Sequence, residues 1–312
     1  MSGMRAQMGV LPLAAFAVTL FAADHHTVRP APSAEYSVES NLVVIPVSVT
    51  DSRNHPVTGL ARDNFRVFDG GIEQPVLQLS RDDTPMAVGL VFDTSLSMTL
   101  KLQAARDAAA AFLATGNLDD EFFLIEFEDQ AQLTQPLTAN PGDIRVRLAQ
   151  AKAKGHTALL DAIRLGIEEV RKSSKPRKAL LVLSDGGDNH SRVTESELSR
   201  SVRETDVLIY SIGLGKPMGK FLPEESDDSQ TLLDAVSRES GGRWYAVDEA
   251  NALGAVAARI GEEMHNRYVL TYTPPASHPD GKYHKVQIKV VPPQGMPALQ
   301  VSSRPGYFSP TM

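Results

Sequence analysis

The strongest constraint on the fold is an alternation of short apolar runs and helix-period segments across residues 84–264. The apolar runs are MAVGLVFD, EFFLIEFED, KALLVLSDG, DVLIYSIGLG and GRWYAVD. Strands with near-continuous hydrophobicity are typical of parallel sheets that helices bury on both faces. Between several runs, apolar residues recur every three or four positions, which indicates helices near 102–113, 160–170 and 253–264. This order predicts a doubly wound, mostly parallel α/β sheet with helices on both faces.

One segment departs from the alternation. Residues 130–138, QAQLTQPLT, follow the apolar run EFFLIEFED with no helical segment between them. A strand that follows another directly is joined to it by a hairpin, and its partner is therefore antiparallel. We expect this segment to form an antiparallel strand at the edge of the sheet.

Strand-like sequence flanks the α/β region on both sides. The first part, 36–83, contains LVVIPVSVTD and two alternating runs on either side of Asp69-Gly70-Gly71. Asp-Gly and Gly-Gly pairs favour hairpin turns, because such turns need positive φ. The last part, 265–309, contains RYVLTYTP, YHKVQIKVV and ALQVSSR. About three strands in each part are too few for an independent sandwich. We therefore expect both ends of the chain to build one small β-domain, with the α/β domain of 84–264 inserted in it.

The N-terminal residues resemble an export signal. Residues 1–23 hold a single cation, Arg5, followed by an apolar run that is short for a membrane-spanning helix. We predict a signal peptide over 1–23 and a flexible leader over 24–35, and hence a periplasmic, cell-surface or extracellular protein. The alternative is a retained N-terminal anchor, in which case the protein would be held at a membrane.

Composition excludes several classes of function. The chain of 312 residues has a net charge of -7, so no overall positive field favours nucleic acid. It contains no cysteine, which removes disulfides, thiolate catalysis and thiolate metal sites. The Walker, G-x-S-x-G and H-E-x-x-H motifs of common enzyme classes are missing from the sequence. We therefore expect that this protein is not an enzyme. The sequence does not indicate its oligomeric state.

Oxygen-bearing side chains gather where the apolar runs end. The stretch Asp93-Thr94-Ser95-Leu96-Ser97 closes the first run, Asp185 closes a later one, and Thr157 opens a helix. In open α/β sheets, ligands bind beyond the carboxyl ends of the strands. Oxygen ligands without sulfur favour a hard divalent cation, Mg²⁺ before Mn²⁺ or Ca²⁺. The candidate metal ligands are Asp93, Ser95, Ser97, Thr157 and Asp185.

These motifs resemble the von Willebrand factor A domain, whose metal-ion-dependent adhesion site combines D-x-S-x-S, a later threonine and a later aspartate. All five positions are matched, with Ser184 where threonine is commoner before Asp185. The resemblance implies that Ser95 and Ser97 bind the metal directly, that Thr157 does so directly or through water, and that the aspartates act mostly through water. More narrowly, IPVSVTD, FRVFDGG and RPGYFSP resemble the exported bacterial VWFA-related family.

Less specific interpretations stay open for several of these residues. Asp93 and Ser95 are also typical helix caps. Asp188 and Asn189 either support the metal site from behind or lie in a solvated turn, which is the commoner situation. His156 and His190 flank the site in sequence, but their position alone does not make them ligands.

The function expected from this pattern is an exported adhesion or protein-binding module. Three neutral hydroxyls and two carboxylates leave a divalent cation short of anionic oxygen, so an open position would accept an Asp or Glu carboxylate from a protein or peptide partner. One alternative is a structural or scaffolding protein whose metal only stiffens the loops. A metal-dependent hydrolase is a further alternative, although D-T-S-L-S lacks the second acid of an aspartyl nucleophile loop.

Overall fold

The computed structural model describes residues 42–215, 226–275 and 280–310. They belong to one compact unit, Ser40–Met312. The predicted signal peptide and leader, 1–23 and 24–35, lie outside the described residues. Among the helices within the described ranges, none is both long enough and apolar enough to cross a membrane.

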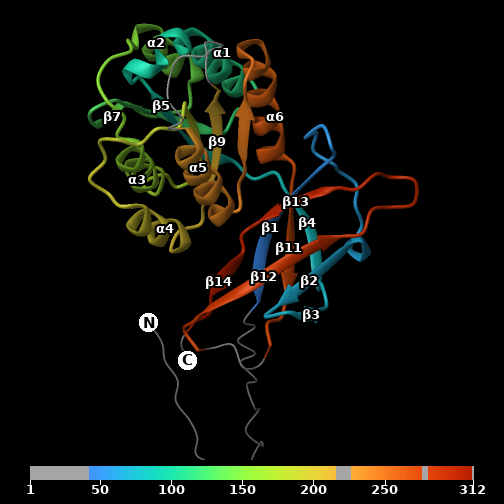
Figure 1. The fold of residues 1–312 in the computed structure, drawn as a ribbon. Coiled ribbons are helices and arrows are strands. Elements are labelled where there is room, and N and C mark those ends of the chain that lie inside the picture. The colour runs from blue at the N-terminus through green and yellow to red at the C-terminus, as the bar shows by residue number, and fades with distance from the viewer. Residues whose placement is uncertain (1–41, 216–225, 276–279, 311–312) are drawn as a thin grey trace, which may run out of the picture. The chain divides into compact units, whose positions relative to one another are not determined.

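A six-stranded sheet forms the centre of the α/β domain (Figure 1). The strand order is β10-β9-β8-β5-β6-β7, and all neighbours are parallel except β6 and β7. The strands are β5 (Met86–Asp93), β6 (Glu121–Phe127), β7 (Ala131–Thr138), β8 (Arg177–Ser184), β9 (Val207–Leu214) and β10 (Trp244–Val247). The antiparallel edge strand expected from QAQLTQPLT is β7. The predicted α/β fold class is confirmed.

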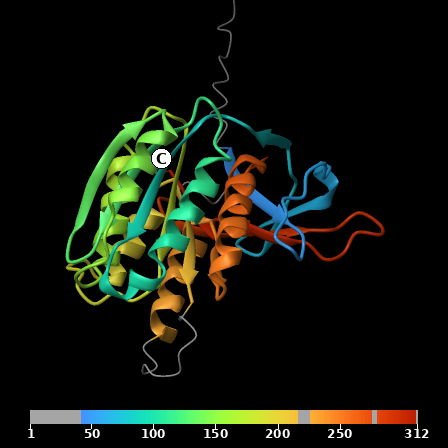
Figure 2. The same cartoon turned by 90° about the horizontal axis from the view of Figure 1, so that it is seen from above.

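Helices cover both faces of this sheet (Figures 1 and 2). One face is covered by α1 (Leu102–Leu113), α2 (Pro141–Gln150) and α6 (Leu253–His265), and Figure 2 shows α1 and α6 side by side. The other face is covered by α3 (Leu159–Val170), α4 (Glu195–Arg203) and α5 (Ser226–Ser240). Every residue of β5 is buried, because this strand lies inside the sheet and under helices on both sides.

A glycine in the middle of β5 sets the packing between neighbouring strands. A Cβ atom added at Gly89 would lie 2.1 Å from Cζ of Phe123 on β6. The Phe123 ring therefore lies over the position that a larger residue would occupy, and it is fully buried. Only glycine admits the ring in this arrangement, because interiors are packed with few voids.

Strands from both ends of the chain pair with one another in two further sheets of four strands each. The first has the order β13-β1-β11-β4 and the second β14-β12-β2-β3. Their strands are β1 (Val43–Thr50), β2 (Phe65–Asp69), β3 (Ile72–Gln74), β4 (Gln78–Asp82), β11 (Arg267–Tyr272), β12 (Tyr283–Val290), β13 (Gln300–Ser303) and β14 (Gly306–Phe308). Both sheets contribute side chains to one apolar core, so they pack face to face.

The predicted hairpin around Asp69 is present between β2 and β3, with Gly70 and Gly71 at φ of 57° and 86°. Positive φ is readily adopted by glycine, which explains the Gly-Gly pair. The apolar sequence after this turn was expected to be one strand, but it divides. β3 pairs within the second sheet, whereas β4 pairs with β11 in the first.

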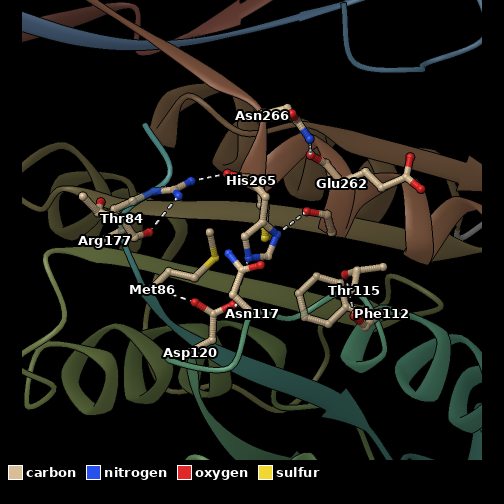
Figure 3. A network of polar contacts seen from close by, with 12 residues as sticks. Thr84, Met86, Phe112, Thr115, Asn117, Asp120, Arg177, Glu262, His265 and Asn266 are labelled. Atoms are coloured by element: carbon tan, nitrogen blue, oxygen red, sulfur yellow. Dashed lines mark hydrogen bonds and ion pairs between the residues drawn. The ribbon is translucent and has the colours of Figure 1, made fainter. Parts of the chain in front are cut away.

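Polar contacts fix the C-terminal end of α6, where the chain leaves the α/β domain (Figure 3). The ring of His265 contacts Oδ2 of Asp120 at 2.8 Å, and Oδ1 of Asp120 accepts a hydrogen bond from the backbone N–H of Met86 at 2.9 Å. Arg177 donates to the carbonyl of Met264. The end of α6 is thus tied to the starts of β5 and β8.

Candidate metal-binding site

The candidate site begins with Asp93, the last residue of β5. Its side chain is completely buried. Oδ1 accepts a hydrogen bond from the backbone N–H of Ser95 at 2.8 Å, and Oδ2 accepts one from Ser184 Oγ at 2.6 Å. Because β5 and β8 are parallel neighbours, their carboxyl ends bring Asp93 and Ser184 together. Asp93 is therefore held by the end of β8 and by the loop that follows β5.

The two serines and Asp185 form a chain of polar contacts in front of Asp93. Ser95 Oγ and Ser97 Oγ lie 3.0 Å apart, and Ser97 Oγ donates to Asp185 Oδ1 at 3.1 Å. Ser95 precedes a 3-10 turn, Leu96–Leu100, but its hydroxyl caps no backbone N–H of that turn. The capping interpretation is thus wrong for the Ser95 side chain, whose oxygen faces Ser97 instead.

Thr157 reaches the same edge of the sheet through backbone contacts. Its loop is joined to the loop after β5 by hydrogen bonds from Lys154 N–H to the Thr94 carbonyl at 2.8 Å and from Leu96 N–H to the Gly155 carbonyl at 3.1 Å. Thr157 is buried. No hydrogen bond among the described residues joins its hydroxyl directly to the other four candidate ligands. The structure therefore connects the side chains of Ser95, Ser97 and Asp185 and joins Asp93 to the backbone of Ser95. Thr157 lies in an adjoining loop.

Asp188 and Asn189 hold that loop in place. Asp188 Oδ1 accepts from the backbone N–H of Leu159 at 2.8 Å, at the start of α3. Asn189 Oδ1 accepts from the N–H of Thr157 at 2.9 Å, and Asn189 N–H donates to the Thr157 carbonyl at 3.0 Å. The stretch is partly solvated, because Asn189 is exposed, but its polar groups also link the loop after β8 to Thr157 and to the start of α3.

Lys101 also belongs to the site, although the motifs in the sequence do not include it. Its Nζ lies 3.1 Å from Asp185 Oδ2 and donates to the Leu214 carbonyl at 3.2 Å. The side chains of Lys101 and Asp185 are only 13% and 10% exposed. The one indication in the sequence is the position of Lys101, directly before the helical segment that starts at Leu102 and four residues after Ser97. Lys101 thus supplies a positive charge to the oxygen cluster from within the chain.

The electrostatics of the cluster suit a cation. Burial raises the pKa of Asp93 to about 6, the charge of Asp185 adds to this shift, and the hydrogen bonds from Ser184 and Ser95 oppose it. Among the described residues, the two shielded carboxylates have one ammonium partner, that of Lys101, so this group of side chains retains a negative charge when both carboxylates are ionised. A cation near buried carboxylates favours their charged form. The donor set is also entirely oxygen, which is the chemistry of hard divalent cations.

Such a site would depend on hydroxyls. Within the described ranges, no group of three or more His, Asp or Glu side chains is arranged to hold a metal ion. The two histidines near the site are engaged elsewhere: their rings stack at 5.1 Å, and a ring nitrogen of His156 contacts Asp129 at 2.8 Å. The residues that fit a cation are therefore the serines, Thr157 and the two aspartates.

Part of the chain is similar to proteins of a known family. Residues 88–187 match the family model of the von Willebrand factor type A domain. Over 163 residues the chain is 26% identical to an uncharacterized protein of Synechocystis sp., sll0103. The match covers 51% of this chain and 36% of that relative, so the chain spans about a third of the relative's length.

Solved structures show the same fold. The von Willebrand factor type A protein of Catenulispora acidiphila has a TM-score of 0.50 at 12% identity, with 79% of this chain and 73% of that chain covered. Proximal thread matrix protein 1 of the mussel byssus has a TM-score of 0.51 at 18% identity, with 63% and 51% covered. Another structure of the mussel protein, with a TM-score of 0.50, 18% identity and 63% and 49% covered, has a zinc-occupied MIDAS motif. Residues 88–187 are thus similar to the von Willebrand factor type A domain, and the solved structures share its fold.

Proposed function

We propose that this protein is an exported binding module that holds a divalent cation, Mg²⁺ in the first instance, and uses it to accept a carboxylate from a protein or peptide partner. The observation that carries the proposal is the contact chain Ser95–Ser97–Asp185 at the carboxyl ends of β5 and β8. Asp93, Ser95, Ser97, Thr157 and Asp185 would hold the ion. The bound cation would supply a positive centre for the partner's Asp or Glu.

The surroundings of the site support a macromolecular partner. Ser97 lies at the surface, and its neighbours Leu96 and Leu100 are 65% and 81% exposed. Large apolar side chains beside a polar centre are typical of interaction surfaces. The partner would therefore place its carboxylate at the ion and apolar groups against these two leucines.

Direct cation binding tests the first half of the proposal. Calorimetric titration with Mg²⁺ and with Mn²⁺ should give saturable binding to the wild type and none to Asp185→Ala. Asp83→Ala is the matched control, because Asp83 is exposed and lies at the opposite ends of the strands. Thermal stability measured in the same samples should rise with the cation in the wild type and the control only. No saturable binding and no stabilisation by either ion would refute the proposed function.

Binding of the protein to surface-immobilised peptides that contain Asp tests the second half of the proposal, the capture of a partner's carboxylate. Capture should require Mg²⁺, should fail with EDTA, and should fail when the peptide Asp is replaced by Asn. The double variant Leu96→Ser, Leu100→Ser should keep its cation affinity and lose peptide affinity. Capture that survives EDTA and Ser97→Ala would instead favour the scaffolding role, and turnover lost on Asp93→Ala would favour a hydrolase.

A further inference from the structure

A fully buried arginine lies far from the cation site without a carboxylate partner. Arg267, the first residue of β11, is 1% exposed and is among the largest completely buried side chains. Its Nη2 donates to the carbonyl of Pro46 at 3.0 Å, whereas Nε and Nη1 have no hydrogen-bond partner in the described part of the chain. Among the described residues, no carboxylate lies within ion-pair distance of this guanidinium. A buried, unpaired charge with unused donors is costly, and native proteins normally provide an acceptor.

A cavity of about 340 Å³ adjoins this arginine. Its walls come from the starts of β8 and β9 in the α/β domain and from β1, β11 and the β13–β14 turn in the β-domain. Apolar side chains form part of the wall: Val44, Ile45, Pro46, Pro176 and Leu208. The volume lies at the lower end of the range of small-molecule sites, roughly 300–1,000 Å³.

The charged groups on the wall leave a positive excess. Four cationic side chains line the cavity, Arg177, Lys178, Arg267 and Arg304, but only two carboxylates, Asp82 and Asp206. Each carboxylate already has a partner, since Asp82 pairs with Arg177 at 3.2 Å and Asp206 pairs with Arg304 at 2.5 Å. Two positive charges therefore remain without a carboxylate.

The four cations differ in how far their donors are used. Arg177 also donates hydrogen bonds to the carbonyls of Asp82 and Thr84. Figure 3 shows the hydrogen bond to Thr84. Lys178 Nζ donates to the carbonyl of Lys175 at 2.8 Å. Arg267 alone among them is completely buried and has two nitrogens without any acceptor. Of the four, Arg267 therefore has the most unused hydrogen-bonding capacity.

We propose that this cavity binds a small organic carboxylate whose apolar body packs against the aliphatic wall and whose oxygens accept from Arg267, with Lys178 adding a second positive charge. Guanidinium–carboxylate hydrogen bonds are among the stronger polar contacts, because both partners are charged. The ligand would contact β8 and β9 on one side and β1 and β11 on the other. It would thereby stabilise the junction between the six-stranded sheet and the β-domain. This site is independent of the cation site, which lies at the other ends of the strands.

Benzoate is a suitable probe, with benzamide as its uncharged match and inorganic phosphate as an anion without an apolar body. Titrations in cation-free buffer at constant ionic strength, followed by calorimetry and by thermal unfolding, should show saturable binding of benzoate and none of benzamide. Arg267→Gln should weaken benzoate at least about tenfold, as expected for a lost charged hydrogen bond. The control Arg66→Gln removes an exposed arginine of β2 that pairs with Glu73, and it should bind benzoate unchanged.

Lys178→Gln provides a second test that does not depend on the folding of Arg267→Gln. Lys178 is only half-buried, and its variant should bind benzoate several-fold more weakly. The proposal is overturned if the wild type binds no benzoate, if benzamide binds equally well, or if a folded Arg267→Gln binds as the wild type does. Should Arg267→Gln fail to fold, unchanged benzoate affinity in Lys178→Gln overturns it. Binding of phosphate alone would overturn the assignment of an apolar ligand body.

Discussion

Lys101 should compete with the cation that we propose for the Asp185 cluster. Its ammonium lies 3.1 Å from Asp185 Oδ2 in a part of the molecule where both side chains are almost shielded from water. A cation that engages Asp185 must therefore displace or repel this ammonium. Replacing Lys101 by Met keeps most of the apolar stem and removes the charge. We expect Lys101→Met to bind Mg²⁺ and Mn²⁺ more tightly than the wild type.

The size of the effect follows from the ion pair. A hydrogen bond between charged groups contributes about 1.5–3 kcal/mol, and each 1.4 kcal/mol corresponds to roughly tenfold in affinity. Removing the competitor should thus tighten cation binding by about 10- to 100-fold. Without a cation, the same variant leaves Asp185 and the buried Asp93 with no ion-paired cation among the described residues. Its free energy of unfolding should fall by about 1–3 kcal/mol, with a drop in Tm of about 2–4 °C per kcal/mol.

The opposite signs of these two changes are the test. Calorimetric titration gives the cation affinity, and thermal unfolding in EDTA gives the stability of the cation-free protein. Lys152→Met is the control, because Lys152 is exposed in the neighbouring loop and its replacement removes the same net charge. If Lys101→Met bound cations no more tightly than Lys152→Met, Lys101 would not be a competitor. If it bound them more weakly, the lysine would have to support the site rather than oppose it.

Two further predictions concern stability. Burial raises the pKa of Asp120, but the hydrogen bonds from His265 and from two backbone N–H groups outweigh burial and hold this pKa below 3.8. A lowered pKa stabilises the fold above pH 3.8 and loses that contribution as the pH falls below it. Asp120→Asn should therefore lower the free energy of unfolding at pH 7 and flatten its decline as the pH falls below 3.8 in urea titrations, whereas two parallel pH curves would contradict this reasoning. Gly89→Ala should cost about 1–3 kcal/mol or more, because the added Cβ would meet Phe123, and an unchanged urea midpoint would show that the ring moves freely.

Periodicity was sufficient to predict the strands of the six-stranded sheet and the helices α1, α3 and α6, but not α2, α4 and α5. The near-continuous apolar run MAVGLVFD forms the fully buried β5, and the run QAQLTQPLT forms the antiparallel edge strand β7. These features depend on local patterns that repeat every two or three to four residues. The division of the sequence after Asp69 between two sheets could not be predicted in this way. It depends on pairing with β11, which lies nearly 200 residues further along the chain.

The candidate site likewise has residues that local sequence patterns predict and residues that only distant contacts define. The D-x-S-x-S stretch and Asp185 are visible in the sequence because each follows an apolar run directly. The roles of Lys101, Asp188 and Asn189 depend on contacts across 84, 29 and 32 positions. Common residue types in loops carry no sign of such partners, since most of them are solvated. The hydrogen bonds in the structure were needed to distinguish these supporting residues from residues of ordinary solvated turns.

The measurement that tests the account most directly is crystallographic. Crystals grown with Mn²⁺ and measured at a wavelength with a strong manganese signal would locate the ion without assumptions about its ligands. We predict one anomalous peak beside the oxygens of Ser95, Ser97 and Asp185, with Lys101 turned away, and no such peak in crystals of Asp185→Ala. A fully occupied peak elsewhere, or an unchanged Lys101–Asp185 pair in saturating Mn²⁺, would contradict the proposed cation site.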